Sequence, residues 1–508
     1  TNVVEISLAD AEKRGYYKLD LTLDAGGAVT RHEAAFAVLP EAGRNWKRED
    51  CPWGTWWFQY SHGAPGDFPT CGPQLQKAGI RKTTAKIRNK ENAETSYSYD
   101  VTTCGNLMAP SMRDFDFSTG KFKPSKVTNR KTKEVTEYDG EQTFVNKVKA
   151  QMEVTPNADH ILIWHESGPH CTRFPDELMG TTPDPKEHAK DVETASYVNE
   201  IGRIVRKHFP QLKIQIGNNS AALGAATRPL RGGANPDYYD CMGIETPSQV
   251  IVPERVIECG FLGFLATKEA ASILCKREVA INGTWEFIYR CERDMGEQQQ
   301  AEWYARDAII AVSHGFFLID IGLLHDCNLG YYNGLWGGSG LIRRAPYVYP
   351  KRAYVAYANV TKMLDDVKFS RALDTGSTTV YANEFKRADG IGERAVRILR
   401  HSIAQNKGGI TDAVQPSGDL RSFLVDGEEL VATAGTDDDA GFYPIVGRRE
   451  ELQRRRGNVA LHHNAVLARR RVPLSDLPFA RHLPVRPQQN RLLLAHLLGR
   501  CDKRHADG

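Results

Sequence analysis

Two glutamates stand where apolar, strand-like runs end, and this placement suggests chemistry that needs a pair of carboxyl groups. Glu166 follows the run 161–164, and a glycine and a proline then break the chain. Glu286 closes the run 279–285 in the same way, 120 residues further on. Cleavage of a glycosidic bond needs one carboxyl group that protonates the leaving oxygen and a second carboxylate opposite it. The two glutamates are therefore candidate catalytic residues of a glycoside hydrolase.

The neighbours of the glutamates suggest separate roles for them. Trp164 and His165 offer apolar bulk and a hydrogen-bond donor, which would help to keep Glu166 protonated as the general acid/base. Glu286 must stay ionised to act as the nucleophile. A lone glutamate at a strand end is ordinarily a surface carboxylate or a helix cap. Two such residues, each after an apolar run and each beside a tryptophan, favour catalysis.

Aromatic and polar residues near the predicted strand ends are candidate sugar ligands. Aromatic rings have large apolar faces, against which sugar rings stack, and the polar residues would bind hydroxyl groups. The predicted substrate-binding residues are His62, Trp57, Trp164, His165, Asn218, Glu245, Trp285, Tyr289 and Trp336.

These residues can act together only in a fold that brings the ends of several strands close to one another. The central part of the chain has the sequence pattern of such a fold. From residue 53 to 365, apolar strand-like runs alternate with amphipathic helical stretches, which is typical of parallel strands with helical crossovers. Strands are expected at 56–60, 79–86, near 97–108, and at 160–164, 213–217, 238–244, 278–284 and 315–321. Helices are expected at 141–152, 195–209, 301–314 and 353–364.

The predicted fold class is α/β, a (β/α)8 TIM barrel with small β-rich flanking domains. Such a barrel carries its active site at the carboxyl ends of the strands. A doubly wound open sheet would show the same alternation, but no glycine-rich phosphate-binding motif follows an early strand.

Four regions are predicted along the chain. Residues 1–40 form a β-rich segment, a partial β-sandwich; residues 41–366 form the barrel; residues 367–446 form a β-sandwich-like domain; and residues 447–508 form a basic tail. The tail holds 13 Arg and one Lys against five acidic residues, a net charge of +9, which leaves the first 446 residues at −6. Its arginine clusters lack interleaved aromatic residues, so we expect no nucleic-acid partner.

Composition limits the other partners and cofactors. No apolar run reaches the roughly 18 residues of a membrane-spanning helix, so no membrane insertion is expected. The ten cysteines show no metal-like spacing, although Cys51 and Cys71 could bridge. We expect a carbohydrate substrate and no cofactor. The oligomeric state is not predicted.

A metal site is the alternative for the histidines around Glu166. A zinc protease motif needs histidines four residues apart on one helix, whereas His165 and His170 are five apart with Gly168 and Pro169 between them. A site built from His160, His165, His170 and Cys171 in another geometry stays open, although we predict no metal.

The residues resemble the (β/α)8 clan of retaining glycosidases, and most of all glycoside hydrolase family 39 and its bacterial relatives. The resemblance covers roughly residues 52–368 and depends on several short motifs. They are Trp53-Gly54, Trp164-His165-Glu166, Trp285-Glu286-Phe287, the segment 298–304, His314-Gly315 and the segment 349–354. It implies Glu166 as acid/base, Glu286 as nucleophile, retention of configuration, and no cofactor.

The chain departs from the clan at two positions. The clan usually has Asn immediately before its acid/base, where this chain has His165. The clan often has Arg in the second strand near Thr84, and the nearest arginine here is Arg81. A carbohydrate-binding barrel that has lost catalysis is therefore the alternative hypothesis.

A bacterial enzyme that acts on a plant or microbial polysaccharide outside the cytoplasm, secreted or periplasmic, fits these features. The glycosylation sequons at Asn218 and Asn282 lie at the predicted active rim, where a glycan would block substrate. Sugar identity, linkage and exo or endo action are not predicted.

Overall fold

The computed structural model describes most of the chain up to residue 401 and short strands beyond it. The described residues are 14–48, 50–57, 68–83, 90–103, 107–156, 158–163, 184–219, 222–238, 240–246, 268–269, 271–275, 282–287, 296–326, 337–344, 347–374, 380–388, 393–401, 422–425, 429–433 and 443–446.

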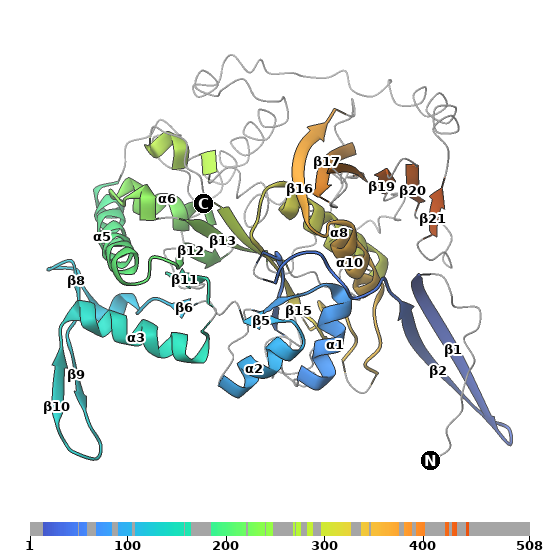
Figure 1. Ribbon diagram of the computed structural model, residues 1–508, viewed down its shortest axis with the longest axis horizontal. Helices are drawn as coiled ribbons and strands as arrows, with labels where there is room; N and C mark the ends of the chain where they lie inside the picture. Colours follow the sequence, from blue (N-terminus) through green and yellow to red (C-terminus); the bar gives the residue numbers. More distant parts are fainter. Residues whose placement is uncertain are drawn as a thin grey trace, which may run out of the picture.

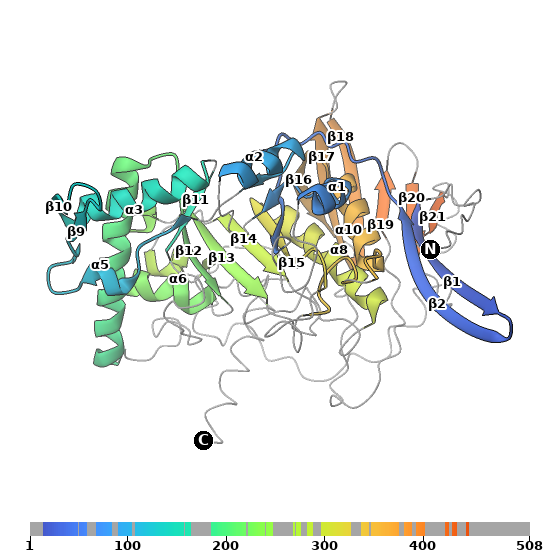
Figure 2. The same cartoon turned by 90° about the horizontal axis from the view of Figure 1, so that it is seen from below.

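A parallel sheet of nine strands forms the centre of the molecule (Figures 1 and 2). Its strands are β3 (Trp53–Trp57), β4 (Lys82–Thr83), β5 (Thr102–Thr103), β6 (Leu107–Met108), β11 (His160–Leu162), β12 (Lys213–Asn219), β13 (Cys241–Thr246), β14 (Asn282–Phe287) and β15 (Leu318–Leu323). The order in the sheet is β5-β4-β3-β15-β14-β13-β12-β11-β6. The two end strands of this order, β5 and β6, are consecutive in the chain with only residues 104–106 between them.

Helices connect these strands. They are α1 (Phe68–Ala78), α2 (Lys90–Ser98), α3 (Gly140–Val154), α5 (Pro185–His208), α6 (Ala222–Arg231), α8 (Glu297–Ser313) and α10 (Arg352–Met363), with 3-10 turns at Met112–Asp114 and Pro236–Tyr238. The helix predicted from residue 195 begins ten residues earlier. Asp184 caps it by accepting a hydrogen bond from the Lys186 amide, and Pro185 fills the first helical position.

The two faces of the sheet differ in character. One face packs into the main hydrophobic core, through Ile161, Ile214, Ile216, Met242, Ile244, Ile319 and Ile321. Residues alternate between faces along a strand, so the other face takes the buried residues His160, Leu162, Gln215, Cys241, Leu318 and Asp320. This second face is polar at several positions, which is unusual for a purely structural interior.

The sheet curls strongly on its second face. The ring centroids of His160, on β11, and Phe317, just before β15, are 5.9 Å apart, and Lys213 Nζ on β12 lies 4.2 Å from the Phe317 centroid. Strands β11 and β15 are four places apart in the sheet order, which would be about 19 Å in a flat sheet. The contacts therefore cross a curved interior.

Hairpins and small sheets flank the central sheet. Strands β1 (Gly15–Ala25) and β2 (Ala28–Val38) form a hairpin that projects from the body, and its turn uses Gly26 and Gly27 at positive φ (Figure 1). The C-terminal strands form two antiparallel sheets: β16 (Val367–Leu373), β17 (Val380–Ala388) and β18 (Glu393–His401), and then β19 (Ser422–Val425), β20 (Glu429–Thr433) and β21 (Tyr443–Val446). The proposed domain boundaries stay predictions.

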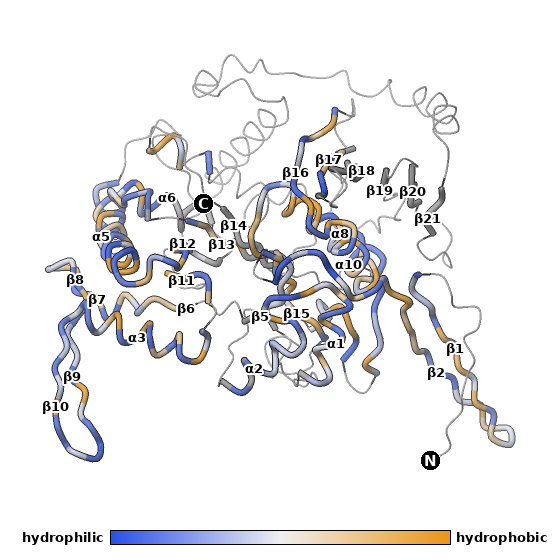
Figure 3. The backbone as a smooth tube through the Cα atoms, viewed as in Figure 1, coloured by the Kyte–Doolittle hydropathy of each residue, from blue (hydrophilic) through white to orange (hydrophobic). Residues whose placement is uncertain are grey.

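Two hairpins between β6 and α3 were not predicted from the sequence. They are β7 (Phe115–Asp116) with β8 (Lys121–Phe122), and β9 (Ser125–Thr128) with β10 (Val135–Tyr138). The first hairpin packs Phe115 and Phe122 against Tyr197 of α5, while the tip of the second is hydrophilic (Figure 3). In the described part of the chain, no helix is long and apolar enough to cross a membrane.

Candidate active site

Strand β14 carries Glu286 one residue before its carboxyl end. The register pairs Glu286 with Glu245 on β13 and with Asp320 on β15. Paired residues of adjacent parallel strands share a face and lie about 4.8 Å apart. Three acidic positions therefore lie side by side at one level of the sheet.

The register also identifies the face that these acidic positions occupy. Ile244 and Ile319, one residue before Glu245 and Asp320, belong to the hydrophobic core. Glu245, Glu286 and Asp320 alternate with the core-facing positions, so they lie on the second, polar face. Asp320 is only 4% exposed there.

Gly54 on β3 is the other register partner of Asp320, and its lack of a side chain is a structural requirement. A Cβ atom added to Gly54 would lie 2.0 Å from Asp320 Oδ1 and 3.2 Å from its Cγ. The carboxylate of Asp320 therefore leans over β3 into the space that any other residue at position 54 would fill. The motif Trp53-Gly54 includes this glycine, but the sequence gives no sign of its contact with Asp320.

A buried lysine takes the corresponding register position on the next strand, β4. Lys82 on β4 pairs with Gly54, is 3% exposed, and its Nζ lies 3.8 Å from Asp159 Oδ2. Burial alone would raise the pKa of Asp159. The hydrogen bond with His160 and the charges of His160, Lys82 and Lys213 outweigh this effect and lower that pKa.

A bulge in β12 sets the position of Asn218. Gly217 adopts φ +66°, and the pairing with β13 shifts at this point, so that Asn218 pairs with Gly243. Gly243 stands two residues before Glu245 and shares its face. The bulge therefore brings the backbone of Asn218 to the polar face, as β-bulges near functional sites often do.

The predicted tryptophans of the sheet fall elsewhere in the register. Trp285 pairs with Ile244 and Ile319, both in the core. Trp57 pairs with Leu323, while Trp56, which is half-buried, takes the alternate face. Substrate binding by Trp285 and Trp57 stays a prediction, and Trp56 is the better placed of the β3 pair.

Six predicted site residues lie outside the described residues: Glu166, His165, Trp164, His62, Tyr289 and Trp336. Counting along the chain nevertheless relates Glu166 to the register. Leu162, Gln215, Cys241 and Asn282 are paired in turn across β11 to β14. Glu166 comes four residues after Leu162, Glu245 four after Cys241, and Glu286 four after Asn282. We call the four paired residues the shared register line.

A buried ion pair follows the carboxyl end of β15 and was not predicted from the sequence. Lys351 Nζ donates to Asp326 Oδ1 at 2.6 Å and to the Gly338 carbonyl at 2.7 Å, and its side chain is fully buried. Burial raises the pKa of Asp326 to about 6, against the opposing charge and hydrogen bond of Lys351. The pair thus joins residues 326 and 338, the two ends of the connection after β15.

His325 is buried beside this ion pair. Neither of its ring nitrogens has a hydrogen-bond partner among the described residues, and burial lowers the pKa of the ring to about 4. His325 is therefore neutral at physiological pH. Its position at a strand end, rather than any motif, is the signal that sequence inspection could have used.

Other residues named from the sequence have structural partners. Arg81 donates to the Trp46 carbonyl and pairs with Asp100 at 3.1 Å, before β4 begins, so these partners occupy its guanidinium. His160 is bonded to Asp159 at the opposite end of β11 from Glu166. Cys51 and Cys71 are both buried, and no disulfide joins them.

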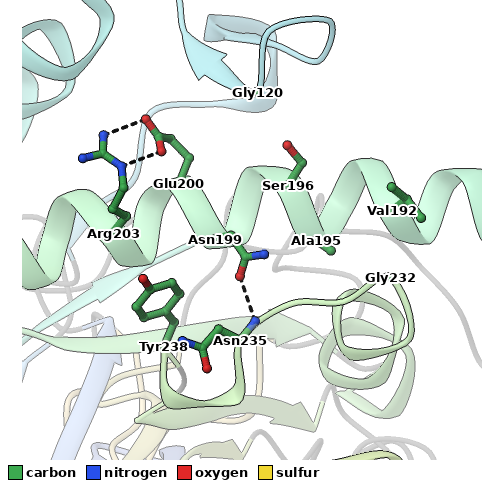
Figure 4. Close-up of a pocket in the computed structure, with 10 residues that line it drawn as sticks. All are labelled: Gly120, Val192, Ala195, Ser196, Asn199, Glu200, Arg203, Gly232, Asn235 and Tyr238. Carbon is green, nitrogen blue, oxygen red and sulfur yellow. Dashed lines mark hydrogen bonds and ion pairs between the residues drawn. The ribbon is translucent and has the colours of Figure 1, made fainter.

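A groove of about 590 Å³ contains no residue of these strand ends in its lining. Figure 4 shows the residues that line it. It runs along α5 and is lined by residues that include Ser196, Glu200, Arg203 and Tyr238. Arg203 pairs with Glu200, and the turn that contains Tyr238 leads into the first residue of β13. Because the groove includes the turn before β13 and no residue at the carboxyl ends of the strands, we do not assign the chemistry to it.

Comparison with known proteins identifies the fold. No protein-family profile and no curated protein matches the chain. The structure is similar to a family 39 glycoside hydrolase from the gut symbiont Bacteroides cellulosilyticus WH2, with 15% identity, a TM-score of 0.51, and coverage of 86% of this chain and 88% of that one.

Two other similar structures have lower scores. A glucosidase from Croceicoccus marinus has 10% identity, a TM-score of 0.39, and coverage of 68% and 77%. A family 51 α-L-arabinofuranosidase from Bifidobacterium longum has 10% identity, a TM-score of 0.39, and coverage of 77% and 87%. The first comparison confirms the predicted similarity to the glycoside hydrolase fold, and at 15% identity it establishes fold and not activity.

Proposed function

We propose that this chain is a retaining glycoside hydrolase whose central sheet closes into a (β/α)8 barrel. Closure is supported by the strand order, which begins with β5 and ends with β6, three residues apart in the chain. It is also supported by the contacts of Phe317 with His160 and Lys213 across the interior. In a closed barrel the segment 102–108 is the third strand and β15 is the eighth.

The observation that best supports this function is that Glu166 and Glu286 come the same number of residues after paired positions of the sheet. Glu286 lies near the carboxyl end of β14, on the polar face, at the rim where barrel enzymes place their active sites. Glu166 stands the same four residues beyond the shared register line as Glu286. An extended chain after β11 would therefore raise Glu166 to the level of Glu286, across the barrel from it.

The mechanism that follows is double displacement. Glu286 attacks the anomeric carbon while Glu166 protonates the leaving oxygen, and Glu166 then deprotonates the water that hydrolyses the glycosyl-enzyme. Asn218 and Glu245 bind sugar hydroxyls in this proposal, which is supported by the register that brings both backbone positions to the same face. The substrate class is a plant or microbial glycan, handled outside the cytoplasm.

Substitution of the nucleophile tests the proposal. Glu286→Gln keeps the size of the side chain and should lower kcat on an aryl glycoside by about 10³-fold or more, because the covalent step is lost. The control is Glu193→Gln, an exposed glutamate on α5. Undiminished hydrolysis by Glu286→Gln, with an unchanged circular dichroism spectrum, would refute the assignment.

The acid/base role has its own test. Glu166→Ala should hydrolyse substrates with good leaving groups far better than substrates with poor ones, and added azide should restore turnover with formation of a glycosyl azide. The configuration of that azide reports retention. An absence of azide rescue in a folded Glu166→Ala variant argues against the role.

A glycan-binding barrel without turnover is the second candidate, and the placement of Arg81 favours it. Arg81 is held by Asp100 and the Trp46 carbonyl, so it does not supply the arginine that the clan often has near Thr84. Glycan binding without hydrolysis over a broad substrate panel would support this candidate.

A further inference from the structure

We propose, on the basis of the proposed function, that Asp320 is a positioning residue that tunes the ionisation of Glu286, and that Gly54 holds the Asp320 carboxylate away from it. Asp320 and Glu286 are register partners on one face of β15 and β14. Their backbones are thus about 4.8 Å apart. Two carboxyl groups that share such a site disfavour each other's ionisation.

The geometry at Gly54 carries the second half of the inference. Asp320 has two neighbours at its level, Glu286 on one side and Gly54 on the other. Its carboxylate occupies the space of the missing Gly54 side chain, where an added Cβ would meet Oδ1 at 2.0 Å. The carboxylate therefore leans toward β3, which lengthens its separation from the Glu286 strand and weakens the repulsion.

Other charged and titratable groups around this level belong to three further elements. Glu245 on β13 is the second acidic neighbour of Glu286. Lys82 on β4 is the nearest cation in the register, and Asp159 already offsets its charge at 3.8 Å. Tyr357 on α10 has a pKa raised mainly by burial and also by the charge of Asp320. Acidic positions therefore stand on both sides of Glu286 in the register, and we infer that its ionisation depends on how far the Asp320 carboxylate is kept from β14.

Two variants should shift the acid limb of the pH profile of kcat/KM in opposite directions. Asp320→Asn removes a negative charge beside Glu286, so the acid limb of the pH profile of kcat/KM should move to lower pH by about one unit. Gly54→Ala displaces the Asp320 carboxylate toward Glu286, so the acid limb should move to higher pH. A role of Asp320 in packing alone would lower activity or stability without these opposite shifts.

The controls separate this effect from general damage. Gly43→Ala adds a methyl group at a glycine with nothing within 4 Å of the new Cβ. Asp184→Asn neutralises an acid that caps α5, and asparagine is an equally good cap. Neither should move the acid limb. If Gly54→Ala does not fold, Asp320→Asn and Asp320→Ala still test the charge effect.

A readout that needs no turnover distinguishes failure of this inference from failure of the proposed function. In protein labelled with carboxyl-¹³C glutamate, the Glu286 resonance can be assigned by its loss in Glu286→Gln and titrated in each variant. Opposite shifts without hydrolysis would retain the inference and remove the glycosidase assignment. Hydrolysis with an unmoved Glu286 titration in Asp320→Asn, or shifts of one sign in both variants, would overturn the inference.

Discussion

Individual buried polar residues hold the end of β15, next to the proposed rim. Lys351 contacts Asp326 and the Gly338 carbonyl, and Gly338 also accepts a hydrogen bond from Gln300 Nε2 at 3.1 Å. The Gly340 amide donates to Asp326 Oδ1 at 3.0 Å. Lys351 therefore joins the start and the end of the 327–337 connection to each other, and Gln300 joins the end of that connection to α8.

Loss of Lys351 should cost more than loss of an exposed lysine. Lys351→Met leaves the buried Asp326 charge without its partner, so the free energy of unfolding should fall by about 3–5 kcal/mol. Lys190→Met, which removes an exposed partner of Glu187, should change it by less than about 1 kcal/mol. Urea denaturation at pH 7 measures both. The double variant Lys351→Met with Asp326→Asn should regain part of the loss, and a double variant no more stable than Lys351→Met contradicts the pairing.

His325 gives a prediction with a defined pH window. Its folded-state pKa of about 4 lies below the ordinary value of 6.5. As the pH falls below 6.5, the ring therefore binds a proton in the unfolded chain before it does so in the folded protein. The stability it contributes is complete above pH 6.5 and is lost as pH falls toward 4, by about 3 kcal/mol.

Substitution by an apolar residue should remove that loss. His325→Leu should be neutral or stabilising at pH 7, because both ring nitrogens lack partners in the described structure, and increasingly stabilising toward pH 5. His32→Leu, at an exposed position of β2, is the control. Urea midpoints at pH 7 and pH 5 that fall equally in wild type and His325→Leu would contradict the prediction.

At the scale of elements, a charged cluster joins the beginning of α3 to the end of α5. Glu141 accepts hydrogen bonds from Lys207, His208 and Arg203, and these contacts, with that of Lys207 first, lower its pKa to about 2. Arg203 also pairs with Glu200 on its own helix. Glu141 lies in the first turn of α3, where the helix dipole also favours a negative charge.

Glu141→Gln should therefore destabilise the protein at neutral pH and cease to matter in acid. The depressed pKa contributes stability that is present above the ordinary value of 4.5 and is lost as pH falls from 4.5 toward 2. We expect a loss of about 1 kcal/mol at pH 7, since the partners are partly exposed. The difference from wild type should shrink in urea denaturation as pH is lowered from 6 to 3.5, and a constant difference would contradict the assignment.

Periodicity predicted the elements better than it predicted their contacts. The strands 213–217 and 278–284 and the helix 141–152 fall within a few residues of β12, β14 and α3, because each carries a clear apolar pattern. Of the residues predicted as a strand at 79–86, the structure describes 79–83, and β4 covers Lys82–Thr83. The hairpins 115–138 were not predicted because strands of two to four residues are too short to show a clear apolar alternation.

The glutamate at the end of β14 was visible in the sequence for the same reason, but the strand pairing that sets its neighbours was not. Gly54 and Asp320 are 266 residues apart, and only strand pairing brings them together. The bulge at Gly217 likewise changes which face Asn218 occupies, and a one-residue shift of this kind leaves no periodic signal. The residues that could act were predictable, and the register that relates them was not.

At the scale of the whole molecule, the decisive property is the curvature of the sheet, because a barrel brings strand ends together and an open sheet spreads them. In a flat sheet β12 and β15, three places apart, would be about 14 Å from each other. Lys213 and Phe317 nevertheless make a cation–π contact, with Nζ 4.2 Å from the ring centroid. The contact therefore reports curvature across the interior.

A double-mutant cycle on this pair tests the curvature in solution. Lys213→Met and Phe317→Leu should each destabilise the protein, and their effects should be non-additive, with a coupling of about 0.5–2 kcal/mol, because each removes the same cation–π contact. The matched control pairs Lys213→Met with Phe369→Leu, an exposed phenylalanine on β16, for which no coupling is expected. Additive effects of Lys213→Met and Phe317→Leu would mean that the interior is open, and Glu166 and Glu286 would then lie too far apart to act on one glycosidic bond.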